Sequence, residues 1–372
     1  MTEENEGRGG RWGLFLLALF VGLPLLALCG LTVLGPPSPE TMVFTFAVTA
    51  MVVGGLMAPW SPRLAWGARL GFVALFLVVV WRVFSADAGR TVRAYTVEAG
   101  SPALASGRLL DTIVPERDVA IGGTLFLQAM GQMGPPEPGL LDALRDGYAR
   151  MRLDQGPVPS STVSTFVMGQ TPEDHTVFRV APADRFNPPE AVVLFLHGSM
   201  GNITVACWQV AQAANPVGLD VICPSTDWRA EWEGEEGQAI VQAALARLRS
   251  ENVRRVYLAG LSRGGIGISR MARDLDVEGI ILISGASSRA RPKRVPTLVL
   301  QGRRDPRTPP APARQYARAV GATYREHPEA GHWMLLSHHE WFESELRRWL
   351  AYREGLGDVH GSGAAEAPTG DN

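Results

Sequence analysis

Residues 256–259 (VYLA) form a short apolar run that ends directly in Gly260-Leu261-Ser262-Arg263-Gly264, and a segment with helical spacing follows. A chain that turns this sharply from strand to helix needs small residues, because neighbouring backbone must approach the turn closely. The glycines of this G-x-S-x-G pattern meet that need. Ser262 is then expected at the end of a strand and at the positive end of a helix. The alternative, a tight turn with a solvated serine, fits the flanking strand and helix less well.

The region around this turn repeats an order of apolar strand, loop and helix. Expected strands cover residues 192–196, 219–223, 256–259, 279–284 and 297–301, and expected helices cover 236–249, 265–275, 311–320 and 340–352. These strands are continuous apolar runs, which is typical of parallel strands buried on both faces. Residues 161–169 and 175–182 alternate instead and predict an antiparallel pair of strands. The sequence therefore predicts an α/β fold with a mostly parallel sheet flanked by helices.

An activated serine needs a base, and the base needs an acid that orients it. Asp305 follows the strand 297–301, and His332 lies in a loop before the final helix. The chain order Ser262, Asp305, His332 is the order that accompanies a G-x-S-x-G turn in an α/β sheet. His327 is a competing base, but it precedes a proline and lies nearer the end of a strand. The sequence therefore predicts Ser262, His332 and Asp305 as a catalytic triad.

A second loop, residues 197–201 (HGSMG), follows the first buried strand. Acyl transfer needs two backbone N–H groups that bind the developing oxyanion. The residue after the serine, Arg263, is expected to supply one of them. Ser199 is expected to supply the other, with Met200 as the adjacent alternative. His197 is interpreted as a structural residue that fixes this loop.

Residues from about 160 to 353 resemble an α/β-hydrolase domain, over roughly half of the chain. The segments HGSMG, GLSRGG, GRRDPRTP and AGHW are similar to that family's oxyanion loop, nucleophile turn, acid turn and histidine loop, in the same order. The resemblance implies a Ser-Asp-His triad without metal or organic cofactor, acting on esters, thioesters, amides or peptides. Only about a dozen residues separate strands 279–284 and 297–301, so the insertion that usually forms a lid is missing and an open site is expected.

The substrate is poorly constrained by the sequence. Trp228 and Trp232 follow the strand 219–223 and could, with Met200, hold an apolar or aromatic acyl group. An equally good interpretation is that the two indoles only pack the loop. An acyl-bearing small molecule is the expected substrate class.

Residues 1–84 contain three apolar segments, 12–33, 41–58 and 64–84, joined by short turn-forming stretches. The first has no charge and enough residues to cross a bilayer, for which about 20 are needed. The sequence predicts three transmembrane helices in a bacterial inner membrane. The distribution of arginines weakly favours a cytoplasmic N-terminus, which places everything after residue 84 outside the cytoplasm. A cleaved signal peptide is disfavoured because the first run is long and two more spans follow.

The remaining regions are assigned by composition. Residues 85–158 are expected to form a partly helical connection, with helices near 118–130 and 140–151, then the catalytic domain over 159–353 and a disordered tail over 354–372. The formal net charge is −2, so nothing indicates nucleic-acid binding. Three cysteines without C-x-x-C spacing disfavour a structural metal site. Cys207 and Cys223 could pair in an oxidising compartment or remain buried thiols.

The leading functional hypothesis is a membrane-anchored serine hydrolase of the carboxylic ester type. A serine peptidase of the prolyl-oligopeptidase type would use the same triad, and an acyltransferase would pass the acyl group to an alcohol. A hydrolase-like receptor or scaffold without catalysis is the non-enzymatic alternative. It is disfavoured because all three triad positions and both loops are present in the sequence.

Overall fold

A computed structural model describes residues 39–58, 60–85, 92–98, 116–131, 133, 137–155, 170–182 and 189–356, together with isolated residues between 12 and 33. The N-terminal elements are α2 (Pro39–Met57), α3 (Pro62–Ser85), β1 (Val92–Glu98), α5 (Glu116–Ala129) and α6 (Leu140–Gln155). The later strands are β2 (Asp174–Val180), β3 (Ala191–Leu196), β4 (Asp220–Pro224), β5 (Arg255–Leu261), β6 (Gly279–Ile283), β7 (Thr297–Gly302) and β8 (Thr323–His327). The later helices are α8 (Thr204–Ala214), α9 (Glu235–Ser250), α10 (Arg263–Met271), α11 (Pro310–Val320), α12 (Met334–Ser337) and α13 (His339–Arg353), with 3₁₀ turns η1 (Asn215–Val217) and η2 (Ala272–Asp274).

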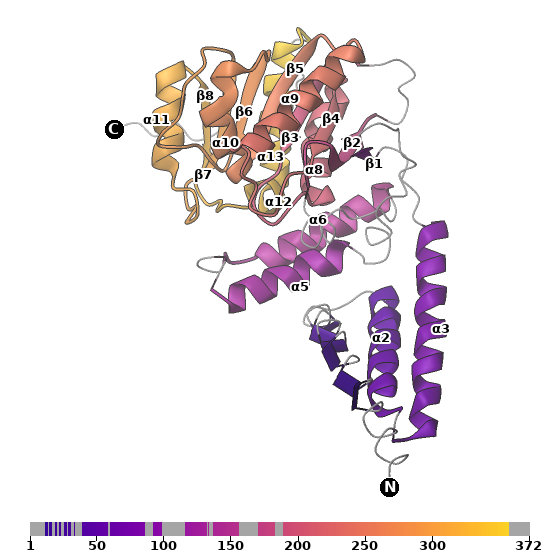
Figure 1. Cartoon of the computed structure of the whole chain (residues 1–372). Coiled ribbons are helices and arrows are strands. Elements are labelled where there is room, and N and C mark those ends of the chain that lie inside the picture. The colour runs from indigo at the N-terminus through magenta and orange to yellow at the C-terminus, as the bar shows by residue number, and fades with distance from the viewer. Residues whose placement is uncertain are drawn as a thin grey trace.

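The described strands form one eight-stranded sheet in the order β1-β2-β4-β3-β5-β6-β7-β8 (Figure 1). Strand β2 runs antiparallel to both of its neighbours, and from β4 to β8 all pairs are parallel. The crossover between β3 and β5 leaves the carboxyl ends of both strands side by side at one edge, where ligand sites of such sheets are formed. The predicted mostly parallel α/β sheet is confirmed.

Helices cover both faces of the sheet because the central strands are apolar on both sides. Val193 and Phe195 pack in one core with α8, α12 and α13, whereas Val192 and Leu194 pack in the other with α9, α10 and α11. Successive side chains of a strand point to opposite faces, so one continuous apolar run supplies both cores. Each of these four side chains is fully buried, which stabilises the fold by about 1.5–3 kcal/mol per side chain.

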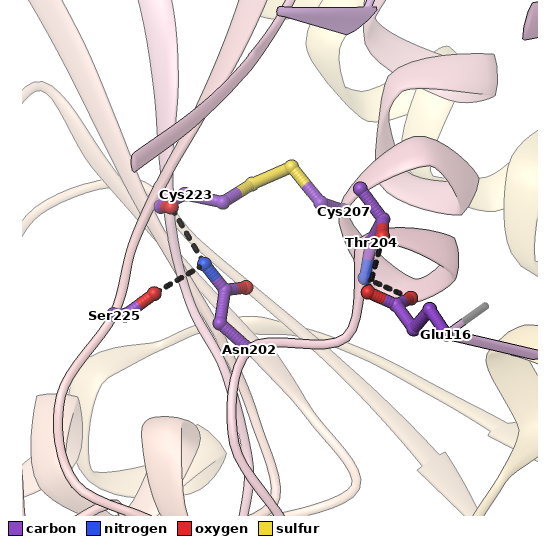
Figure 2. The surroundings of a disulfide bond; sticks show 6 residues. All are labelled: Glu116, Asn202, Thr204, Cys207, Cys223 and Ser225. Atoms are coloured by element: carbon purple, nitrogen blue, oxygen red, sulfur yellow. Dashed lines mark hydrogen bonds between the residues drawn. A yellow bond between two sulfur atoms is a disulfide. The ribbon is translucent and has the colours of Figure 1, made fainter. Parts of the chain in front are cut away.

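Helices α5 and α6 form a hairpin that lies between the sheet and the α2–α3 pair (Figure 1). Leu140, Leu144 and Tyr148 of α6 are buried in the same core as α8 and α12. Glu116, the first residue of α5, lies at the start of α8, where its carboxylate accepts hydrogen bonds from the Thr204 N–H (2.6 Å) and hydroxyl (2.5 Å) (Figure 2). A carboxylate at a helix N-terminus also interacts favourably with the helix dipole.

A disulfide joins Cys207 of α8 to Cys223 of β4 (Figure 2). Of the two alternatives that the sequence left open, the structure has the paired form. The bond encloses a separation of 16 residues, and closing a loop of that size stabilises a fold by about 3 kcal/mol in the chain-entropy account. It fixes helix α8, and with it the loop 197–203 that precedes the helix, to the neighbouring strand.

The two N-terminal helices that the structure describes pack as an antiparallel pair. A Cβ at Gly71 of α3 would lie 2.6 Å from the Ala47 carbonyl oxygen of α2, so glycine is required at this contact. Among the described residues, no helix combines the length and apolar character needed to cross a bilayer. The prediction of three transmembrane helices is therefore not confirmed, and part of its first segment, residues 12–33, lies outside the described residues.

Two elements, β1 and α8, differ from the sequence-based expectation for physical reasons. Strand β1 lies in the expected connecting region and pairs antiparallel with β2, from Val92 opposite Val180 onward; its partner is some 80 residues away, beyond the reach of local patterns. Helix α8 was not predicted, because it is buried on nearly every side and lacks a polar stripe. Strand β8 ends at His327, where the sequence analysis expected the end of a strand, although its polar residues lack strand periodicity. The predicted strand 161–169 lies outside the described residues, as do tail residues 357–372.

Candidate active site

Ser262 stands at the turn between β5 and α10 with φ 55° and ψ −113°. A residue with a Cβ pays a conformational cost at positive φ, so such a geometry persists only where the surroundings impose it. Here the Ser262 N–H donates to the Ile283 carbonyl (2.8 Å), and the Ser262 carbonyl accepts from the Ile266 N–H (2.9 Å). The serine is thus held in a strained backbone position by the next strand and by its own helix.

Two glycines allow the turn to approach neighbouring backbone. A Cβ at Gly264 would lie 2.1 Å from the Leu196 carbonyl oxygen, and one at Gly260 would lie 2.5 Å from the Gly264 carbonyl carbon. A side chain at Gly264 would force the turn away from the end of β3, and one at Gly260 would force β5 away from the start of α10. The close approach brings the serine next to the loop after β3, since a Cβ at Gly198 would lie 3.1 Å from the Ser262 Cβ.

The structure brings Ser262, His332 and Asp305 together in one hydrogen-bonded chain. The Ser262 hydroxyl lies 2.9 Å from His332 Nε2, and His332 Nδ1 lies 2.9 Å from Asp305 Oδ2. Because an ionised carboxylate only accepts, Nδ1 carries the proton and Nε2 is left to accept from the serine. His332 and Asp305 are 4% exposed, whereas the serine borders a cavity. The imidazole is therefore oriented as a base toward the serine.

The Asp305 carboxylate is bound on both oxygens by the turn that contains it. Oδ1 accepts from the Arg307 and Thr308 N–H groups (2.8 and 2.9 Å), and Oδ2 also contacts the Thr308 hydroxyl (2.6 Å). Burial alone would raise the pKa of Asp305, but the hydrogen bonds and charge of His332 and the Thr308 contacts outweigh it and lower the pKa. The acid is therefore ionised where the imidazole needs a negative partner.

Two backbone N–H groups beside Ser262 are available for an oxyanion. Arg263 opens helix α10, where its N–H has no carbonyl four residues earlier in the same helix. The Ser199 N–H has no acceptor within the described part of the chain. The Met200 N–H, in contrast, donates to the Trp228 carbonyl (2.9 Å). Of the two donors that the sequence offered from this loop, the geometry favours Ser199.

His197 holds this loop from beneath. The Thr226 N–H donates to His197 Nε2 (3.1 Å), so Nδ1 must carry the proton, and it donates to the Gly198 carbonyl (2.7 Å). Burial lowers the pKa of His197 to about 4. The neutral ring links the loop after β3 to the loop after β4, which agrees with its interpretation as a structural residue. Asn202 links the same two loops through the Cys223 carbonyl and the Ser225 hydroxyl (Figure 2).

The serine opens into a cavity of about 380 Å³. Met200 and Trp228 line it, as expected for substrate-binding residues. Trp232 does not: its indole is fully buried and donates to the His197 carbonyl (2.9 Å). The prediction of Trp232 as a substrate-binding residue is therefore wrong, and the alternative that this indole packs the loop holds.

The α5–α6 hairpin contributes to this site, which the sequence did not indicate. Leu127 of α5 and Met133 line the cavity. Glu137, just before α6, accepts hydrogen bonds from the N–H groups of His332 (3.0 Å) and Trp333 (3.3 Å). No local signal could have found these contacts, because Glu137 and His332 are 195 residues apart. His327, the competing base, instead accepts from the Ala330 N–H (3.1 Å) and shapes the loop.

The fold is that of an α/β-hydrolase. It has the strand order of this fold, an antiparallel second strand, helices on both faces of the sheet and a strained serine after β5. No helix interrupts the chain between β6 and β7, so the structure lacks a lid insertion there, as the sequence predicted. Within the described residues no group of three or more His, Cys, Asp or Glu side chains could hold a metal ion.

Comparison with known proteins finds a family model and several solved structures that resemble part of this chain. A family model described as TAP-like protein, of the α/β-hydrolases, matches residues 284–354. Among solved structures, XC6422 from Xanthomonas campestris, described as an α/β serine hydrolase without lid, is 18% identical with a TM-score of 0.41, covering 50% of this chain and 91% of that one. Est1E from Butyrivibrio proteoclasticus is 13% identical with a TM-score of 0.40, covering 49% and 95%. Esterase Pf2001 from Pyrococcus furiosus is 12% identical with a TM-score of 0.41, covering 50% and 91%. No curated protein matches the sequence.

The buried neutral His197 predicts that stability falls with acid. The unfolded ring has a pKa of 6.5 and the folded ring about 4, so between these values only the unfolded state binds the proton. The free energy of unfolding should fall by about 3 kcal/mol as the pH drops from 6.5 to 4. Urea denaturation at several pH values should show a smaller fall in His197→Gln, whereas the control His339→Gln should behave as wild type. An equal pH dependence in all three proteins would contradict this account.

The Glu137 contacts predict that the hairpin positions the histidine loop. In Glu137→Gln one acceptor oxygen is replaced by an NH₂ donor that opposes a backbone N–H. Because hydrogen bonds to charged groups contribute about 1.5–3 kcal/mol, the rate at which a fluorophosphonate probe labels Ser262 should fall about 10- to 100-fold. The exposed Glu329→Gln, in the same loop, is the matched control. Unchanged labelling in Glu137→Gln would mean that the loop holds its geometry without the hairpin.

Proposed function

We propose that this protein is a serine hydrolase that cleaves an ester or a related acyl bond through an acyl-enzyme. The observation that carries the proposal is the hydrogen-bonded chain from Ser262 through His332 to Asp305, with the serine at a strained turn that faces a cavity. Buried structural serines do not need an oriented imidazole and a carboxylate behind it, whereas nucleophilic serines do. The α/β-hydrolase fold supports the same conclusion by analogy only.

The proposed reaction follows from the geometry. Ser262 Oγ attacks the acyl carbon while His332 Nε2 takes the hydroxyl proton, and Asp305 stabilises the resulting imidazolium. The carbonyl oxygen becomes an oxyanion, which the N–H groups of Ser199 and Arg263 bind. Collapse of this intermediate expels the alcohol, which receives the proton from His332. Water then attacks the acyl-enzyme by the same steps and releases the acid. Losing one such N–H donor typically costs about 2.7–4 kcal/mol of barrier.

The nucleophile can be tested by labelling of the full-length protein with a fluorophosphonate probe. Wild-type protein should be labelled, and Ser262→Ala should not, with hydrolysis reduced by about 10³-fold or more. The exposed Ser337→Ala is the control and should retain labelling. Absence of labelling in folded wild-type protein would leave the non-catalytic receptor or scaffold.

The bond that is cleaved can be tested with paired ester and amide substrates of the same acyl group. We expect hydrolysis of the ester with a kcat/KM well above that of the amide or of a proline-containing peptide. Faster cleavage of the peptide would favour the peptidase, and transfer to an added alcohol in preference to water would favour the acyltransferase.

We also propose that the N-terminal region attaches the protein to a bacterial inner membrane, with the α/β domain outside the cytoplasm. The described faces of α2 and α3 support attachment because they expose large apolar side chains: Met42, Val43, Phe46, Trp66, Leu70, Phe72, Val73, Phe76, Leu77 and Trp81. So much exposed apolar surface is unfavourable in water. The disulfide supports an oxidising compartment.

Fractionation and thiol alkylation test this proposal together. The full-length protein should stay with membranes after an alkaline carbonate wash. In the denatured protein, Cys207 and Cys223 should react with a maleimide only after reduction, whereas Cys207→Ala/Cys223→Ala should gain no reactivity. Release by carbonate would contradict attachment through apolar surface, and two thiols that react without reduction would contradict an oxidising compartment.

A further inference from the structure

Arg307 places a guanidinium group in the wall of the catalytic cavity. It follows Asp305 and Pro306 in the turn after β7, and it lines the same cavity as Ser262 and His332. Its side chain is partly buried, and its Nε and Nη2 atoms are buried without a hydrogen-bond partner among the described residues. The triad does not use this side chain, because only the Arg307 backbone N–H contacts Asp305.

Two carboxylates act on the charge of Arg307 without forming a direct ion pair with it. Glu137 and Asp305 are close enough to act on it electrostatically, but Glu137 already accepts from the histidine loop and Asp305 from His332 and its own turn. Within the part of the chain that the structure describes, neither carboxylate forms an ion pair with the Arg307 guanidinium. Arginine remains protonated at neutral pH, so this is a standing positive charge.

The second arginine of the cavity wall, Arg263, differs from Arg307 because a carboxylate lies beside it. Arg263 has Glu233 at 3.6 Å, and Glu233 also binds Arg270 at 2.6 Å. Among the described residues, those that line the cavity include these two arginines, no aspartate or glutamate, and mostly apolar side chains such as Leu127, Met133 and Ile203. An anion that entered would therefore meet positive charge in surroundings of low dielectric constant, where attraction is strong.

We propose that Arg307 binds a carboxylate group of the substrate, so that the preferred substrates are acyl esters whose acyl chain ends in a carboxylate. A guanidinium presents paired N–H donors that match a carboxylate in a bidentate contact. A carboxylate at the cavity wall would pair with the charge of Arg307, whereas a neutral ester of the same length would not. The reaction itself is unchanged: the distal carboxylate stays intact while the ester is hydrolysed at Ser262. This inference rests on the proposed hydrolase function.

The test compares mono-4-nitrophenyl esters of dicarboxylic acids, from adipate to sebacate, with their methyl-capped neutral counterparts. Full-length wild-type protein should show a kcat/KM about 10- to 100-fold higher for the acid form at the best chain length. Arg307→Gln should lose this ratio, and Arg307→Lys should keep part of it because it keeps the charge. The matched control is Arg304→Gln, an exposed position of the same turn that does not line the cavity; its ratio should equal that of wild type.

Two results would overturn the inference: a wild-type preference for the neutral esters, or an acid preference that persists in Arg307→Gln. Failure of the hydrolase proposal is separable from failure of this one. Binding of the carboxylate can be measured without turnover in Ser262→Ala. Calorimetric titration of this variant with free adipate, suberate or sebacate should show binding, and the double variant Ser262→Ala/Arg307→Gln should show none. Dicarboxylate binding without any ester hydrolysis would support the anion site at Arg307 and contradict the hydrolase proposal. Ester hydrolysis without dicarboxylate binding would support the hydrolase proposal and contradict the anion site.

Discussion

The site depends on the close packing of backbone where the turn after β5 meets the end of β3. Gly264 lies against the Leu196 carbonyl, and Gly260 lies against Gly264 itself. This contact lets the helix α10 begin within reach of the loop after β3, so that the N–H groups of Arg263 and Ser199 border one cavity. The strained φ of Ser262 is a consequence of the same packing. Side-chain contacts refine the site, but main-chain geometry creates it.

Carboxylates hold the loops and the helix start around this packed centre. Asp305 is held by its own turn and orients His332. Glu137 holds the loop on which His332 is carried, and Glu116 holds the start of α8. Each of them accepts backbone N–H groups, for which a charged acceptor is about twice as strong as a neutral one. These three carboxylates all have hydrogen-bond partners in the described chain, whereas the guanidinium of Arg307 in the cavity wall has none.

The sequence was sufficient to predict those elements that depend on residues close to one another along the chain. The buried strands are continuous apolar runs, and the order of Ser262, Asp305 and His332 along the chain follows the order of the strands that carry them. Trp232 was misassigned because an indole in a loop is equally suited to line a cavity or to pack beneath it, and only the neighbouring His197 carbonyl decides between them. Leu127, Met133 and Glu137 could not have been found, since their role depends on contacts with residues far along the chain.

The contribution of the α5–α6 hairpin changes what counts as the folding unit of this molecule. Strand β1 completes one edge of the sheet, and α6 covers part of a core that α8 and α12 share. A cut at residue 159, where the sequence pattern changes, would remove Leu140 and Tyr148 and expose the core residues that they cover. It would also remove the Glu137 and Glu116 carboxylates, which accept the N–H groups of the histidine loop and of the start of α8. The hydrolase-like half therefore shares its sheet and one of its cores with residues that precede 159. Any shortened form intended for crystallisation or swapping between proteins has to begin before β1.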